Sequence, residues 1–209
     1  MPEPPSIDGG RIGPGPMDIS TLSEPHLVPI AGKPGAATAG SVVRVLNLDL
    51  QLPAVSARAA ADGSFATSVL ASAGNELRFE ALSEGRRSAP ADFIYTSNAG
   101  DQLTPSPRHD CLTLSPGFDL EVPASGVATL RLSNECADAI TLATPRFRSA
   151  GAFELATPLP LLVAAGGEGQ LELRLSAATP GAAEDVLFLD VTLATRTLRY
   201  PIGLFTPAP

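Results

Sequence analysis

The chain has two cysteines, Cys111 and Cys136, and a pair of thiols can form a disulfide, bind a metal ion or supply a nucleophile. Strands are expected over Cys111–Leu114 and Val127–Ser133, and antiparallel pairing of these strands would bring the two cysteines close together. A disulfide would close a loop of about 25 residues, contribute roughly 3 kcal/mol to stability and require an oxidising compartment. The sequence favours this bond over two separate thiols. A metal site needs three or four ligands, and none cluster around either cysteine.

The two histidines, His26 and His109, offer a second route to chemistry. His109 stands before Asp110 and Cys111, and alternate residues of a strand share a face, so His109 and Cys111 could act as a base and its nucleophile. Such a pair also needs an orienting group and an oxyanion donor, and the sequence marks neither. We therefore interpret His109 as a histidine of a linker between domains.

Carboxylates near predicted turns are oxygen ligands of the kind that calcium prefers. Asp62-Gly63-Ser64 and Asp49 form the first such group. Three more acidic residues lie in other segments and could join an interdomain site: Asp18, Glu24 and Asp92. Calcium needs several oxygens that converge, whereas Asp-Gly is a strong hairpin signal, because both residues tolerate positive φ. We therefore predict a turn at Asp62 and no cofactor, with calcium as the alternative.

The glycine-rich run at residues 166–169 lacks the Lys-Ser/Thr pair of a phosphate-binding loop, so we expect a hairpin turn there. No serine lies in the G-x-S-x-G pattern of a nucleophile elbow. Since no other catalytic constellation is recognisable, we expect that the protein is not an enzyme.

The composition favours short elements and many turns. Of 209 residues, 21 are proline and 19 are glycine, 44% are hydrophobic, and tryptophan is absent. The formal net charge of −8 argues against nucleic-acid binding and against electrostatic binding to anionic membranes, which both need clustered Lys and Arg. Lys33 is the single lysine, and an Ala/Pro/Arg-rich, lysine-poor chain suggests a bacterium with a GC-rich genome.

No run of about 18 apolar residues is present, so no membrane span is expected. The N-terminus lacks the apolar core of a signal peptide. The protein is therefore expected to be cytoplasmic, or exported by a route without such a peptide, or derived from a precursor whose signal has been removed. A Cys111–Cys136 disulfide would favour a location outside the cytoplasm or at the cell surface.

Alternating apolar and polar residues between turn signals predict an all-β protein. Residues 1–18, dense in proline and glycine, are predicted to be an extended arm or linker. Residues 19–96 form the first predicted domain, residues 97–109 a polar linker and residues 110–209 the second domain. Strands at intervals of roughly 8–12 residues predict sandwiches rather than a βαβ fold.

The clearest strand pattern lies between residues 40 and 81. Ser41–Leu48 and Glu76–Leu82 alternate between apolar and polar residues, which predicts two strands with one buried face each. Asp62-Gly63 and Gly74-Asn75 are the predicted turns, and Phe65 is the expected inward anchor of the strand between them.

The first domain resembles a bacterial Ig-like module over residues 26–96, through A-T-A-G-S-V-V-R-V, A-D-G-S-F, G-N-E-L-R-F-E-A and S-A-P. Residues 110–205 resemble the Hydin-type (ASH/MSP-like) Ig fold. There a strand that ends in an asparagine, here L-R-L-S-N at Asn134, precedes a strand like I-T-L, and G-A-F-E-L, G-E-G-Q-L-E-L-R-L and T-P-G follow. These resemblances imply two tandem immunoglobulin-like β-sandwiches that serve as structural or binding modules.

We therefore expect a non-enzymatic structural or interaction protein. It would be a subunit of a larger bacterial assembly, or a cell-surface module, that binds protein partners through edge strands and loops. A carbohydrate-binding or adhesion module is the alternative. Such sites usually present exposed aromatic rings, and without tryptophan the stacking residues would be Tyr95 and Tyr200. A strand-donating role of the chaperone type is a third hypothesis.

Overall fold

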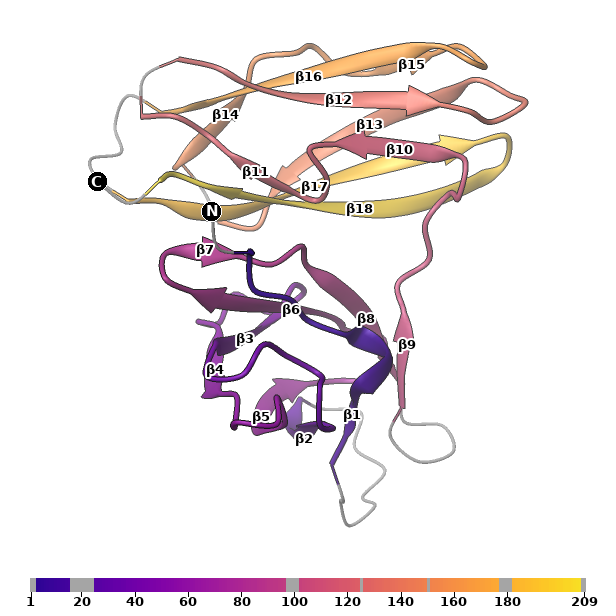
Figure 1. The fold of residues 1–209 in the computed structure, drawn as a ribbon. Helices are drawn as coiled ribbons and strands as arrows, with labels where there is room; N and C mark the ends of the chain where they lie inside the picture. Colours follow the sequence, from indigo (N-terminus) through magenta and orange to yellow (C-terminus); the bar gives the residue numbers. More distant parts are fainter. Residues whose placement is uncertain are drawn as a thin grey trace. The chain divides into compact units, whose positions relative to one another are not determined.

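The computed structural model describes residues 3–15, 25–96, 102–124, 126–149, 151–176 and 182–207. The chain divides into two compact units, Met1–Ser106 and Pro107–Pro209. Apart from one short 3-10 turn, η1 (Gly9–Arg11), the regular structure of the described residues consists of β-strands (Figure 1). Among the same residues, no helix is long and apolar enough to cross a membrane.

Unit 1 contains two antiparallel sheets. The smaller sheet has the strand order β1-β2-β5, with β1 at Ile12–Pro14, β2 at His26–Gly32 and β5 at Phe65–Ala71. The larger sheet has the order β4-β3-β6-β8-β9, and the short strand β7 pairs with β6. The bounds of its strands are β3 Val42–Asn47, β4 Val55–Arg58, β6 Glu76–Ser83, β7 Arg86–Arg87, β8 Ala91–Thr96 and β9 Gln102–Pro105.

One hydrophobic core joins the two sheets of unit 1, because alternate residues of the strands point inward from both sheets. Val43 of β3 and Phe79 of β6 are completely buried. Phe65, the expected inward anchor, is 6% exposed and fills the space beside Gly32. A Cβ atom on Gly32 would lie 2.2 Å from the Phe65 ring, so this packing requires glycine at position 32.

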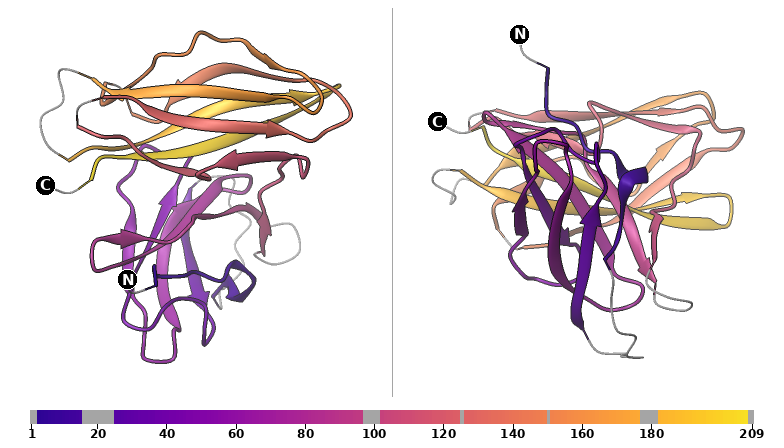
Figure 2. Two further views of the ribbon diagram at one scale, coloured as in Figure 1. Left: turned by 45° about the horizontal axis from the view of Figure 1, so that its top comes forward. Right: turned by 60° about the horizontal axis from the view of Figure 1, so that its bottom comes forward.

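The N-terminal segment belongs to the fold of unit 1, which corrects its interpretation as an arm or linker at residues 1–18. Of this stretch, residues 3–15 are described. β1 pairs with β2, and Ile12 is buried in the core of the unit. Figure 2 shows the indigo segment against the purple strands of the same unit. β1 has three residues and one buried side chain, so it shows no alternation of apolar and polar residues that would predict a strand. The proline and glycine content of the segment therefore resembled that of a linker.

The predicted linker at 97–109 also needs correction, because β9 lies inside it. β9 pairs with β8 and extends the larger sheet of unit 1, and Leu103 packs against the core. The prolines and polar residues of this stretch resemble a linker, but an edge strand tolerates both. Residues 97–101 of the predicted linker lie outside the described residues.

Unit 2 also contains two sheets. The first has the order β10-β12-β16-β14 and the second has the order β11-β18-β17-β13-β15 (Figure 1). β11 runs parallel to β18, and the other pairs are antiparallel. The bounds are β10 Leu112–Ser115, β11 Asp119–Glu121, β12 Ala128–Asn134, β13 Ile140–Phe147, β14 Phe153–Leu155, β15 Leu161–Val163, β16 Glu168–Leu175, β17 Glu184–Leu193 and β18 Arg196–Phe205.

Leucines from both sheets form the core of unit 2, among them Leu130 of β12 and Leu187 of β17. Asn134, at the end of β12, is completely buried within this core region. Its Nδ2 group lies within 3.1 Å of the carbonyl oxygens of Val163 and Ala164, and its Oδ1 accepts the N–H of Cys136 at 3.0 Å. The buried amide therefore joins the end of β12 to the segment that follows β15.

Candidate functional site

A disulfide between Cys111 and Cys136 ties the start of β10 to the residues just beyond β12. The backbone N–H of Glu135 donates to the carbonyl oxygen of Cys111 at 2.8 Å, so the β10–β12 ladder continues up to the disulfide. The bond thereby fixes the register of β10, in which Thr113 lies opposite Ser133. In this register the outward side chains of β10 and β12 lie side by side on one surface of the sheet.

The outer surface of β10, β12 and β16 carries only polar side chains at its centre. On β12, Leu132 points into the core, so Arg131 and Ser133 point outward. On β16, the same alternation turns Glu168 and Gln170 outward. We call the following six residues the polar face: Thr113, Ser115, Arg131, Ser133, Glu168 and Gln170.

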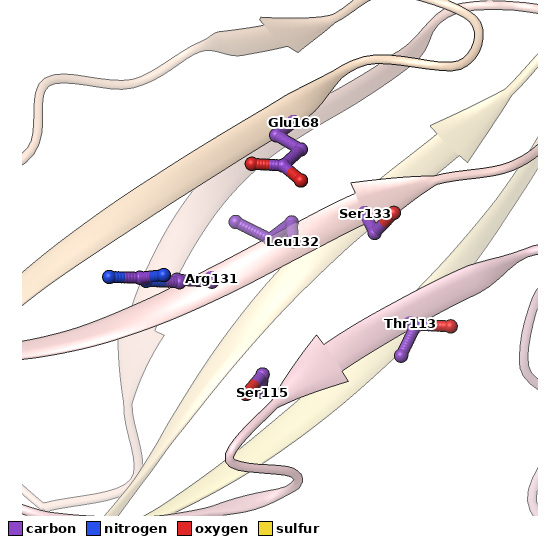
Figure 3. Close-up of a pocket in the computed structure, with 6 residues that line it drawn as sticks. All are labelled: Thr113, Ser115, Arg131, Leu132, Ser133 and Glu168. Carbon is purple, nitrogen blue, oxygen red and sulfur yellow. The ribbon is translucent and has the colours of Figure 1, made fainter.

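Two shallow hollows lie on the polar face. One has a volume of about 150 Å³ and is lined by residues of β10 and β12 together with Glu168 (Figure 3). The other has a volume of about 220 Å³ and is lined by Arg131, Glu168, Gly169 and Gln170. Because Arg131 and Glu168 line both hollows, these two side chains stand at the centre of the site.

The two charges of the polar face are not paired with each other. Arg131 lies opposite Gln170 in the β12–β16 register and Glu168 lies opposite Ser133, so Arg131 and Glu168 are diagonal neighbours. In Figure 3 the Arg131 side chain extends along its strand, away from Glu168. Within the described part of the chain, neither side chain makes an ion pair or a side-chain hydrogen bond.

The same sheet offers a contrast farther along β16. Arg174 lies directly opposite Glu154 of β14, and their charged groups meet at 2.8 Å. Among the described residues, the sheet therefore contains one closed charge pair and three outward charges without an ion pair. These three are Arg131, Glu168 and Glu172, of which Arg131 and Glu168 line the hollows and form the open pair of the polar face. Exposed, unpaired charges of opposite sign beside three hydroxyl groups can bind a partner with polar and charged groups.

Gly169 allows β16 to lie close to β15. A Cβ atom at position 169 would be 2.7 Å from Cγ2 of Val163, so a larger residue would push the start of β16 outward. Glu168 and Gln170 flank this glycine on the polar face. Since β16 begins at Glu168, and β15 and β16 lie in different sheets, the hairpin turn expected at residues 166–169 is corrected to a connection between the two sheets.

His109 is not a linker residue, because unit 2 buries it to 6% exposure. Its Nε2 lies 3.1 Å from the carbonyl oxygen of Val191, and its backbone N–H donates to the hydroxyl of Tyr200. Cys111 is in the disulfide. The His–Cys nucleophile considered from the sequence is therefore not available in this oxidised state. His26, the other histidine, has its Nε2 3.2 Å from the hydroxyl of Tyr95.

The acidic residues considered for calcium serve local structure. Asp62 accepts hydrogen bonds from the hydroxyl of Ser64 at 2.7 Å and from its N–H at 2.9 Å, and these bonds lower the pKa of the Asp62 carboxyl. Asp49 accepts the N–H of Glu76 at 2.7 Å. Asp92 binds Arg78 through both of its oxygens.

Asp18 and Glu24 lie outside the described residues. Among the described residues, no group of three or more His, Cys, Asp and Glu side chains could hold a metal ion. Gly63, in the turn before β5, has φ +81°, and Gly74, in the turn before β6, has φ +90°.

Sequence reasoning did not single out Arg131 and Glu168. The alternation in V-A-T-L-R-L-S places Arg131 on the side away from the leucines, and G-E-G-Q-L does the same for Glu168. That signal predicts exposure, which most arginines and glutamates share. Only the register of β12 on β16 reveals that the two charges lie on one hollowed surface.

The open edges of three strands offer few backbone donors. On β10 the N–H of Leu112 already donates to His109, and Pro116, which follows the strand, has no N–H. In an antiparallel pair, every second residue of an edge strand points its backbone groups away from the partner strand. On β1 and β9 these residues include Pro14 and Pro105, which therefore face the open side. Proline at an open edge is a common protection against the addition of a foreign strand.

No protein-family model matches the sequence, and no curated protein matches it. Among solved structures, an MSP family member of C. elegans is similar at 18% identity and a TM-score of 0.36, over 48% of this chain and 100% of that one. A Vibrio cholerae VesB protease structure is similar at 10% identity and a TM-score of 0.38, and this chain covers 62% of its length. A Porphyromonas gingivalis protein of unknown function is similar at 14% identity and a TM-score of 0.36, over 98% of this chain and 100% of that one. At these TM-scores the likenesses assign no family.

Proposed function

We propose that the chain is a non-enzymatic interaction protein, a subunit of a larger assembly or a cell-surface module, that binds a protein partner through the polar face of unit 2. The observation that carries this proposal is the open charge pair of Arg131 and Glu168 around two adjoining hollows. Most exposed charges are merely solvated, but here a guanidinium, a carboxylate and three hydroxyls surround the same hollow surface.

Two tandem immunoglobulin-like sandwiches are the architecture that we infer for this function. Each unit has about the size of one such domain, and in each the inward faces of two sheets share one core. Modules of this type present faces, edges and loops to partners. The prolines at the open sides of β1 and β9 and after β10 make these three edges poor templates. We assign binding to the polar face because it carries the open charge pair and the two hollows.

The disulfide supports a location outside the cytoplasm. A Cys111–Cys136 bond persists in an oxidising compartment, whereas cytosolic thiols are kept reduced. We therefore propose that the protein acts in an extracytoplasmic compartment or at the cell surface of a bacterium, which also suits its lysine-poor composition.

Neither of the two tyrosines considered for a carbohydrate-binding site has an exposed ring. Tyr95 is completely buried in the core of unit 1, and Tyr200 is 1% exposed in the core of unit 2. A sugar ring stacks on an exposed aromatic face, and neither tyrosine presents one. A protein partner is therefore the better candidate.

A photocrosslinking amino acid at Gln170, in cells of the organism that encodes the chain, tests the proposal. We expect a defined crosslinked partner whose yield falls strongly when Arg131→Glu is added. The same amino acid at Ser56, an exposed position of β4 in unit 1, is the control. A Gln170 yield no higher than the Ser56 yield, or one insensitive to Arg131→Glu, would refute binding through the polar face.

A further inference from the structure

We infer that the polar face binds a second copy of this chain, with Arg131 of each copy paired to Glu168 of the other. This inference rests on the proposed function, because it names the partner of the same face. It follows from the charges around the two hollows, where Arg131 is an unpaired cation and Glu168 an unpaired anion. Glu172, the next outward carboxylate of β16, lines neither hollow.

A two-fold interface must be self-complementary, because the same patch meets itself in reverse. A two-fold axis in the plane of the interface, perpendicular to the line between Arg131 and Glu168 and passing midway between them, would place each charge over its opposite in the second copy. Both pairs would then form together, because the spacing of the two residues is the same in each copy. A face with two charges of one sign would repel itself under this operation.

The side chains around the charges permit this approach. Thr113, Ser115 and Ser133 are short, and each offers a hydroxyl to a neighbouring polar group. The hollows beside Arg131 and Glu168 leave room for a guanidinium that enters from the opposite copy. The closed Arg174–Glu154 pair at the far end of β16 offers no free charge to a partner.

The formal charge of −8 on each chain opposes self-association. The two reciprocal Arg131–Glu168 pairs therefore fix the orientation of one copy on the other and compensate for part of this repulsion. Exposed pairs are weak and sensitive to salt, so we expect a dimer that dissociates in the micromolar range or above and weakens as ionic strength rises.

Charge exchange, followed by sedimentation velocity over a range of concentrations, tests the inference on the full chain with its disulfide intact. We expect the unaltered chain to dimerise, and Arg131→Glu and Glu168→Arg each to weaken the dimer about tenfold or more. The double exchange R131E/E168R restores the dimer, because it reverses both pairs together. An equimolar mixture of the two single variants forms a heterodimer, because one copy then presents two anions and the other two cations.

Arg174→Glu is the control, since it changes the same charge on the same sheet outside the polar face and leaves the dimer unchanged. Unfolding curves of all variants show whether the fold is kept. A chain that stays monomeric at every concentration would overturn the inference, and so would single variants that are not rescued by mixing. If these chains stay monomeric while crosslinking from Gln170 to another protein still depends on Arg131, the inference fails and the proposed function stands.

Discussion

Two glycines of unit 1 form a matched pair that tests how tightly its loops are packed. Gly63 has φ +81° and Gly74 has φ +90°, so alanine is strained in the backbone at either position. A Cβ atom on Gly74 would meet no heavy atom within 4 Å, whereas one on Gly63 would lie 2.3 Å from the carbonyl oxygen of Ala37. Only Gly63→Ala therefore adds a steric clash to the conformational cost.

The expected losses follow from these contacts. Positive φ costs alanine about 1 kcal/mol in either turn. At Gly63 the clash is with backbone, which must move and thereby weakens two hydrogen bonds, from the N–H of Gly35 to Asp62 at 2.7 Å and from the N–H of Ala37 to Gly63 at 3.1 Å. At about 1 kcal/mol for each bond, Gly63→Ala loses about 3 kcal/mol against about 1 kcal/mol for Gly74→Ala.

Urea unfolding of the two variants beside the unaltered chain measures the difference in the free energy of unfolding. A second readout follows from the hydrogen bond between the N–H of Asp8 and the carbonyl oxygen of Ala36, which holds the N-terminal segment to the same loop. Limited proteolysis of residues 3–15 should therefore quicken in Gly63→Ala and not in Gly74→Ala. Equal losses of stability in the two variants would refute the reasoning from the Ala37 contact.

The remaining predictions concern unit 2. Replacing Cys111 and Cys136 together by alanine should lower the free energy of unfolding by about 3.5 kcal/mol, the loop-closure value for a separation of 25 residues, and a loss under about 1 kcal/mol would contradict it. Asp185 is 8% exposed, and burial raises the pKa of its carboxyl, so the native state binds its proton more tightly than the unfolded chain does. The contribution of Asp185 to the free energy of unfolding should therefore rise as the pH falls from 7 toward the unfolded pKa of about 3.9. Asp185→Asn, which keeps an acceptor for the N–H groups of Ser149 and Val186, should be more stable than the unaltered chain at pH 7 and should remove this part of the pH dependence. Unfolding measured at several pH values would contradict this if the two proteins differed by the same amount throughout.

The alternation of apolar and polar residues was enough to predict the strands that carry several apolar residues at a spacing of two. The prediction over Ser41–Leu48 contains β3, and the one over Glu76–Leu82 matches β6 within one residue, because each strand has apolar residues at a spacing of two. The expectation of one buried face was wrong for β6, in which Glu76, Arg78 and Glu80 are buried as well. β1 and β9 lack this signal. Each is short and contains a proline, and Ile12 and Leu103 are the single apolar side chains that pack inward.

The polar face could not be predicted because it depends on pairing between distant strands. Arg131 and Glu168 lie on neighbouring strands, but three other strands separate them in sequence. A shift of one residue in the register of β12 on β16 would place them differently. The buried Asn134 helps to fix this register, because its amide binds the segment between β15 and β16, whereas the disulfide acts on the register of β10. The partners of an amide cannot be read from its position in the sequence.

The two buried tyrosines give each unit its own optical label. The chain has no tryptophan and two tyrosines, of which Tyr95 belongs to the core of unit 1 and Tyr200 to that of unit 2. In a Tyr95→Phe chain, tyrosine fluorescence would come from unit 2 alone, and in a Tyr200→Phe chain from unit 1 alone. The melting of either module can thus be followed in the intact protein without any attached dye.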